Sequence, residues 1–102
     1  MNTIDHHLYS LDHLEGNGHE TLQFIHKAPK EGDASGDMEL KESGTTNEEV
    51  IRVVIDRIET MDKKFACLEN SIAISHLSIA LGALEDRTRG RKARGVEGKA
   101  KE

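Results

Sequence analysis

The chain has 102 residues, of which 35% are hydrophobic and 32% charged, with one tyrosine, two phenylalanines and no tryptophan. Because globular domains usually contain about 45–50% apolar residues, this composition predicts one small domain with a thin core and excludes a large cofactor-binding enzyme. The single cysteine excludes an internal disulfide framework, and the apolar runs are too short for a membrane span.

The beginning of the chain is acidic and rich in histidine, and it contains no apolar segment of the kind found in secretory signals. Together with the single cysteine, this indicates a protein that works in a reducing compartment.

Charge is distributed unevenly, although the net charge is only −5. Residues 1–86 contain 17 acidic and 7 basic residues, a net of −10, whereas residues 87–102 contain 7 basic and 2 acidic residues, a net of +5. Such a basic end indicates an anionic partner. Charge alone leaves both interpretations open but favours the alternative, a solvated tail that aids solubility.

Residues 1–44 are expected to form a β-rich region with loops. The Gly-Asn-Gly sequence at 16–18 predicts a turn, and the alternation of Leu22, Phe24 and His26 predicts a strand over 19–27 that ends before Pro29. The glycine-rich residues 30–37 predict a loop, and residues 38–42 predict a second short strand.

Catalytic and metal-binding arrangements are not apparent. His6, His7 and His13 could bind a metal, but no cysteine or carboxylate spacing completes a site, so no metal is expected. Cys67 and His76 are nine residues apart on one predicted helix and would face opposite sides, which disfavours a nucleophile pair. No glycine-rich phosphate loop follows a strand. We therefore expect a protein without catalytic activity or cofactor.

Residues 45–98 are expected to form a two-helix hairpin, followed by a flexible tail at 99–102. Thr45, Thr46 and Asn47 supply a cap and Glu48 and Glu49 suit the helix dipole, so a first helix is predicted over Asn47–Lys63. Its apolar residues recur at helical spacing: Val50, Val54, Ile58 and Met61, with Ile51 and Ile55 beside them.

A second helix is predicted from Ala66 to about Lys92, and its apolar arc is wider than the roughly 100° stripe of an ordinary surface helix. Small residues form one line along it: Ser71, Ser75, Ser78 and Gly82. Apolar residues flank this line on both sides: Leu68, Ile72 and Ile79 on one, Ile74, Leu77 and Leu81 on the other. The first helix can cover only one side. We therefore expect self-association through this helix, although serine and glycine could simply be tolerated on an exposed face.

The predicted fold class is accordingly α+β, with a small N-terminal antiparallel β region followed by a long helical hairpin that mediates oligomerisation. Near the end of the second helix, Arg87 and Arg91 lie one turn apart, and planar guanidinium groups suit phosphate. Local pairing with Glu85 and Asp86 is the alternative. Gly95 then predicts a left-handed cap at the helix end.

The sequence from Phe65 to Leu77 (FACLENSIAISHL) and the block LEDRTRGRKARGVEG at 84–98 resemble the C-terminal helical hairpin of phage anti-Thoeris sponge proteins, which are related to the anti-CBASS sponges. The family pattern reads F-x-C-R-E-N and R-T-x-x-R-x-x-R-G-V-E-G, and the resemblance covers roughly residues 20–98. It implies a protein of the host bacterial cytoplasm that sequesters glycocyclic ADP-ribose isomers and CBASS cyclic di- and trinucleotides without cleaving them. It also implies assembly into helix-packed dimers and hexamers.

The resemblance assigns roles to individual residues. Asn70 matches the family asparagine that contacts ligand, Arg87 and Arg91 match the two arginines that hold the pyrophosphate, and Arg94 matches a third family arginine.

The adenine-stacking aromatic of the family falls nearest to Met61, with Phe65 four residues later. The chain departs from the family pattern at Leu68, which replaces an arginine, and at Ala83, which replaces a large aromatic. These departures bear on ligand choice and affinity more than on the fold.

Two other functions remain open at this stage. The protein could bind nucleic acid through its basic C-terminus, although the net charge of −10 over residues 1–86 argues against broad DNA contact. It could also be a structural oligomer without a ligand. Phosphate-backbone binding would weaken steeply with salt, whereas a pocket would saturate at a fixed number of sites.

Overall fold

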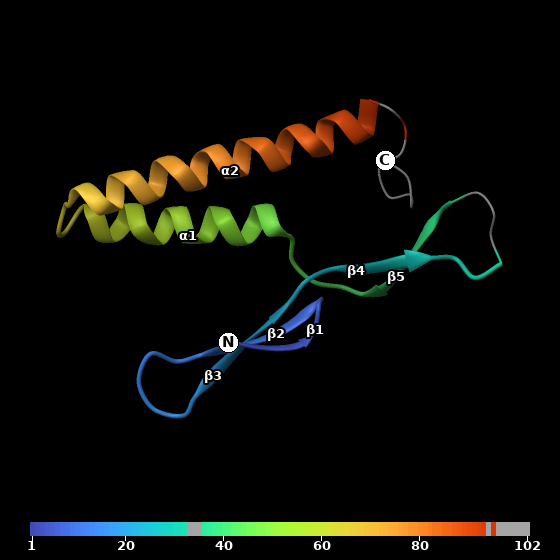
Figure 1. The fold of residues 1–102 in the computed structure, drawn as a ribbon, viewed down its shortest axis with the longest axis horizontal. Helices are drawn as coiled ribbons and strands as arrows, with labels where there is room; N and C mark the ends of the chain where they lie inside the picture. The colour runs from blue at the N-terminus through green and yellow to red at the C-terminus, as the bar shows by residue number, and fades with distance from the viewer. Residues whose placement is uncertain (33–35, 94, 96–102) are drawn as a thin grey trace. The chain divides into compact units, whose positions relative to one another are not determined.

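The structure is a computed structural model that describes residues 1–32, 36–93 and 95 (Figure 1). It has the predicted α+β class: antiparallel strands come first in the chain and two helices follow. The chain divides into two compact units, one formed by Met1–Thr46 and the other beginning at Asn47. Arg94 and the predicted tail at 99–102 lie outside the described residues.

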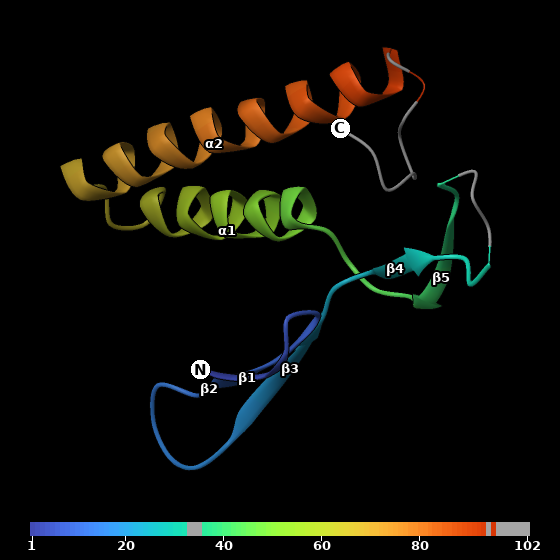
Figure 2. The same cartoon turned by 45° about the vertical axis from the view of Figure 1, so that its right-hand side comes forward.

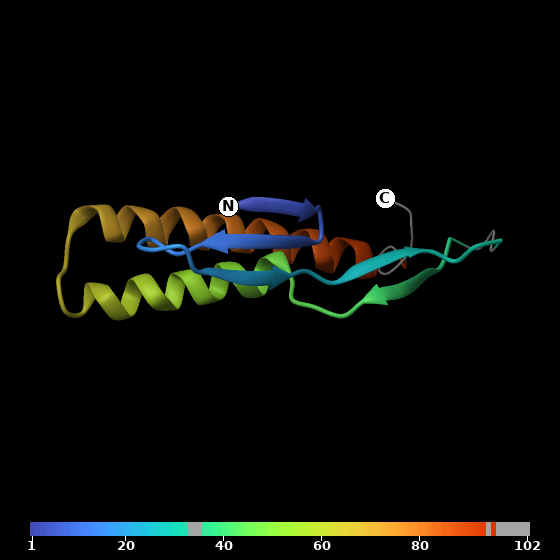
Figure 3. The same ribbon diagram turned by 90° about the horizontal axis from the view of Figure 1, so that it is seen from below.

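The first unit contains a three-stranded antiparallel sheet in the order β1 (Asn2–Asp5), β2 (Leu8–Asp12) and β3 (His19–Gln23) (Figure 3). β2 and β3 pair without interruption from Leu8 opposite Gln23 to Asp12 opposite His19. Sequence analysis missed β1 and β2, because every residue of β1 is exposed and the pattern shows no apolar face. Backbone pairing, rather than alternation of apolar side chains, defines these strands.

The single strand predicted over residues 19–27 is wrong. The chain forms β3, then leaves that sheet and forms β4 (His26–Pro29), which pairs with β5 (Met38–Glu42) in a separate two-stranded sheet. The change of partner occurs where the Phe24 amide donates to the His7 carbonyl at 2.7 Å and the next amide, of Ile25, donates to Thr45 at 2.8 Å. Two neighbouring amides therefore bond to different segments, and this divides the predicted strand.

Gly44 allows the backbone at the end of the first unit to approach closely the backbone at Gln23 and Phe24, where β3 ends. A Cβ at Gly44 would lie 2.5 Å from the carbonyl oxygen of Gln23, which no side chain could occupy without moving the backbone. The next amide, of Thr45, donates to the same Gln23 carbonyl at 2.9 Å. The close approach explains why glycine stands at this position.

The second unit is an antiparallel helical hairpin made of α1 (Asn47–Asp62) and α2 (Leu68–Ala93), which lie side by side in Figures 1 and 2. Both helices were predicted to within two residues at each end. Gly95 has a φ of +69° and its amide donates to the Lys92 carbonyl at 3.0 Å, so the predicted left-handed cap is confirmed.

The inner face of α1 differs slightly from the predicted stripe. Ile51, Ile55 and Ile58 are partly buried, whereas Val54 and Met61 are exposed. Val54 and Met61 lie beside the face of α1 that α2 covers rather than on it. The helical spacing of the apolar residues was therefore predicted correctly, but the centre of the covered face was not.

α2 is covered on one side only. Ile74, Leu77 and Leu81 are partly buried, whereas Leu68 and Ile79 remain 71% and 70% exposed. No described residue is fully buried. Within the ranges that the structure describes, no helix combines the length and the apolarity needed to cross a bilayer.

Candidate functional site

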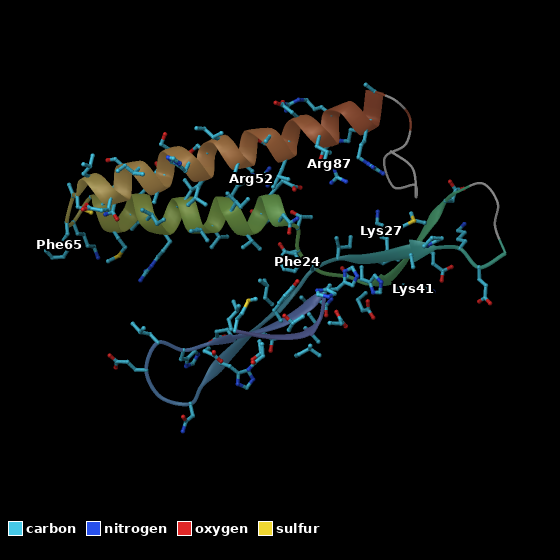
Figure 4. The ribbon with its side chains drawn as sticks, viewed as in Figure 1. Phe24, Lys27, Lys41, Arg52, Phe65 and Arg87 are labelled. Carbon is cyan, nitrogen blue, oxygen red and sulfur yellow. The ribbon has the colours of Figure 1, made fainter. Side chains whose placement is uncertain are left out.

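The basic end of α2 carries the arginine pair predicted from the sequence. Arg87 (Figure 4) is exposed. Arg91 is partly buried and lies one turn further along the same continuous helix. Arg94, the third predicted site residue, lies outside the described residues.

Glu85 and Asp86, the two carboxylates that precede this pair on α2, each contact another arginine. Glu85 accepts from Arg52 of α1 at 3.3 Å, and Asp86 pairs with Arg89 one turn along α2. Arg52 also lies 3.7 Å from Glu49. Sequence analysis missed the Arg52–Glu85 pair because the two residues are 33 positions apart and meet only when the hairpin closes.

A hollow of about 200 Å³ opens beside this ion pair, between the start of α1 and the second half of α2. Five residues line it: Glu48, Arg52, Glu85, Thr88 and Arg89. Its lining therefore combines two carboxylates with two guanidinium groups, and the predicted pair at Arg87 and Arg91 is not part of it.

The opposite end of the hairpin carries the other predicted site residues. Phe65 lies in the turn that joins the helices and is 78% exposed (Figure 4). Its amide donates to the Met61 carbonyl at 3.0 Å, which folds the turn back onto the end of α1. Met61 is exposed beside it. An apolar, accessible surface thus lies at the turn.

Asp62 joins the two helices at this turn. Its Oδ1 accepts from the backbone amide of Cys67 at 3.2 Å and from the side-chain Nδ2 of Asn70 at 3.1 Å. No feature of the sequence indicated that Asp62 contacts a predicted site residue. Asp62 lies four residues before the predicted helix start at Ala66, too far for the usual capping pattern, so no local signal marks it.

The structure does not bring the two ends together within one chain. Asn70 and Arg87 are seventeen positions apart on one uninterrupted helix, which at 1.5 Å per residue separates them by about 25 Å. Figure 4 shows Phe65 at the turn and Arg87 toward the other end of α2. Within one chain, the predicted site residues therefore form two separate groups rather than one pocket.

The histidines of the first unit make local contacts. The rings of His7 and His26 stack with centroids 3.8 Å apart, and the His26 Nδ1 lies 2.5 Å from Glu42. His13 lies 3.0 Å from Glu20. In the part of the chain that the structure describes, no group of three or more histidine, cysteine or acidic side chains is placed to hold a metal.

The architecture is thus that of a small α+β protein whose helical hairpin carries the predicted site residues at its two ends, with arginines at one end and Phe65, Met61 and Asn70 at the other. The chain is similar to a protein named Thoeris anti-defense 1 from Bacillus phage SBSphiJ7, with 44% identity over 57 residues. The match covers 55% of this chain and 40% of that protein, so the chain spans less than half of the length of this relative. No family model and no solved structure matches the chain.

Proposed function

We propose that this protein is a phage anti-defence sponge, which binds cyclic nucleotide immune signals in the host bacterial cytoplasm and does not cleave them. The proposed ligands are glycocyclic ADP-ribose isomers and CBASS cyclic di- and trinucleotides. The observation that carries the proposal is the 44% identity to a phage protein named for anti-defence against Thoeris. The paired arginines of α2 support it independently.

The arginine pair supports an anionic, phosphate-containing ligand. Two guanidinium groups one turn apart repel each other unless an anion bridges them. Each can offer two parallel N–H donors to phosphate oxygens. We assign the pyrophosphate of the ligand to Arg87 and Arg91.

The turn end supports contact with a nucleobase. Phe65 offers an exposed aromatic face, and the Met61 thioether can pack against a ring. Stacking contributes about 1–3 kcal/mol per base in proteins that bind single-stranded nucleic acid. The proposal therefore places adenine against Met61 and Phe65, with Asn70 contacting the ligand nearby.

A complete pocket then needs two chains. Since about 25 Å of helix separates Asn70 from Arg87, we assign Asn70 and the turn to one chain and both arginines to an antiparallel neighbour. The exposed apolar side of α2, with Leu68 and Ile79 about 70% accessible, supports such an assembly. The proposed state is a hexamer built from dimers of helical hairpins.

Complementation between variants tests the function and the shared site together. The variants Asn70→Ala and Arg87→Ala/Arg91→Ala should each lose binding of a cyclic ADP-ribose isomer in isothermal titration calorimetry. Unfolding and refolding the two as a mixture should restore part of the binding capacity. Co-assembly without any recovery would place the site within one chain.

The wild-type protein provides the first control. Its melting temperature should rise with cyclic ADP-ribose isomers, because a ligand that binds only the folded state stabilises it by mass action. Binding to duplex DNA that weakens steeply with salt, with no response to cyclic nucleotides, would support nucleic-acid binding instead.

A further inference from the structure

The side chain of Asp62 is placed to control how Asn70 presents its amide. A single oxygen, Oδ1, accepts both the amide of Cys67 at 3.2 Å and the Nδ2 of Asn70 at 3.1 Å. Both Asp62 and Asn70 are partly buried, so water competes less for these bonds than on an open surface.

The chemistry of the pair fixes the orientation of the amide. An ionised carboxylate can only accept hydrogen bonds, and in an asparagine side chain only Nδ2 carries hydrogens. The Nδ2 group of Asn70 must therefore face Asp62. The carbonyl oxygen Oδ1 of Asn70 then points away from Asp62.

The position of Asp62 makes this arrangement rigid. Asp62 is the last residue of α1, and its bond to Cys67 holds it at the N-terminal end of α2. The partial positive charge of a helix N-terminus also stabilises a carboxylate there. Asp62 thus cannot turn away from Asn70 without giving up both bonds.

We propose that Asp62 is a positioning residue, which holds the Asn70 amide so that its carbonyl oxygen accepts a hydrogen bond from the ligand. This inference rests on the proposed function, because Asn70 must contact a nucleotide. It specifies the chemistry of the ligand group that Asn70 meets. That group is an N–H or O–H donor, such as the exocyclic amine of adenine or a ribose hydroxyl.

Exchange of the two side chains tests the inference with a glycocyclic ADP-ribose isomer as the probe. Asp62→Asn keeps the shape of the side chain and an acceptor for Cys67. An amide can also donate, so the Asn70 amide could rotate by about 180° and turn its nitrogen toward the ligand, and affinity should fall by about tenfold. Asn70→Asp places two carboxylates together and should weaken binding by more than about a hundredfold. The double variant Asp62→Asn/Asn70→Asp again pairs one donor with one acceptor and turns an oxygen toward the ligand, but an amide nitrogen at position 62 cannot accept from Cys67 as the carboxylate oxygen does. Its affinity should therefore exceed that of Asn70→Asp by about tenfold without reaching that of the wild type.

Recovery in the double variant is a result that a purely structural role of Asp62 would not produce. Glu59→Gln makes the same carboxylate-to-amide change at an exposed position of α1 and should leave the affinity unchanged. Circular dichroism and light scattering confirm that each variant keeps its helices and assembly. The side-chain amide of Asn70, one of four asparagines in the chain, gives an NMR signal that should move in Asp62→Asn and stay in Glu59→Gln.

The source of the donor is distinguished by the same isomer with hypoxanthine in place of adenine. Weaker binding identifies the base amine, and unchanged binding identifies a ribose hydroxyl. If the wild type binds and the double variant does not recover, the function stands and the role of Asp62 is overturned. If the wild type binds no cyclic nucleotide, the proposed function fails and this inference fails with it.

Discussion

The two apolar sides of α2 are nearly equal in composition but not in environment. Leu77 and its neighbours on one side are partly buried against α1, whereas Leu68 and Ile79 on the other side are about 70% exposed. Solvation of apolar side chains costs roughly 25 cal/mol per Å². α1 thus covers one apolar side of α2 and leaves the other exposed, and this exposed side is where we propose that a second copy of the chain packs.

The largest expected effect is loss of assembly on changing the exposed side. Ile79→Asp would bury an unpaired charge at the proposed interface, which should weaken association by more than about 3 kcal/mol. Light scattering should then give the monomer mass of 11.3 kDa while the helix content stays unchanged. The control Thr60→Asp adds the same charge at an exposed position of α1. A wild-type protein that is already monomeric at micromolar concentration would contradict the expected assembly.

Changing the covered side should instead weaken the hairpin itself. Leu77→Ala removes partly buried methyl groups and leaves a gap against α1, so the free energy of unfolding should fall by about 2 kcal/mol. Urea denaturation at several protein concentrations measures it. The loss should be the same at each concentration, since the contact lies within one chain. A loss that disappears on dilution would place Leu77 at an interface between chains.

Replacing Gly82 with a larger residue should stabilise the isolated hairpin but weaken the association of chains. A Cβ at Gly82 meets nothing within 4 Å in its own chain. Gly82→Leu should therefore stabilise an isolated hairpin by up to about 1 kcal/mol through helix propensity. At a close helix crossing the same side chain would push the helices apart and shift the assembly toward monomers. Gly82→Ala serves as the smaller step. Unchanged assembly in both variants would exclude Gly82 from the interface.

The smallest expected effect concerns the ion pair between the helices. Arg52 lies 3.3 Å from Glu85 and 3.7 Å from Glu49, but about 40–60% of each side chain is exposed. Solvent screening limits such pairs to about 0.5 kcal/mol, so Arg52→Gln should lower stability only slightly. High salt should remove the difference. Arg57→Gln, on the exposed side of the same helix, provides the control.

The helices could be predicted because their signals are local. The capping residues at 45–47, the helical spacing of the isoleucines and the glycine at 95 each act within a few residues. The strands β1 and β2 could not, since their residues are largely polar or exposed and pair with distant backbone. The break after β3 depends on carbonyls of His7 and Thr45, which no local pattern indicates.

The candidate site was predictable only in part. Arg87, Arg91 and the exposed Phe65 are where the sequence placed them. Asp62 was missed because its role arises when the turn brings it against Asn70, eight residues later. Contacts of this kind depend on the geometry of the turn rather than on spacing along a helix.

The uninterrupted α2 has a consequence for how the protein responds to its own concentration. Under the proposed shared site, its 26 residues keep the two half-sites of one chain too far apart to act alone. Ligand affinity must then fall when the protein is diluted below the dissociation constant of the assembly, and ligand must in turn favour association by thermodynamic linkage. As the protein accumulates from a low concentration, its ligand-binding capacity would rise more steeply than the number of chains. Ligand binding would therefore show a threshold in protein concentration, because the length of α2 makes a second chain necessary for each site.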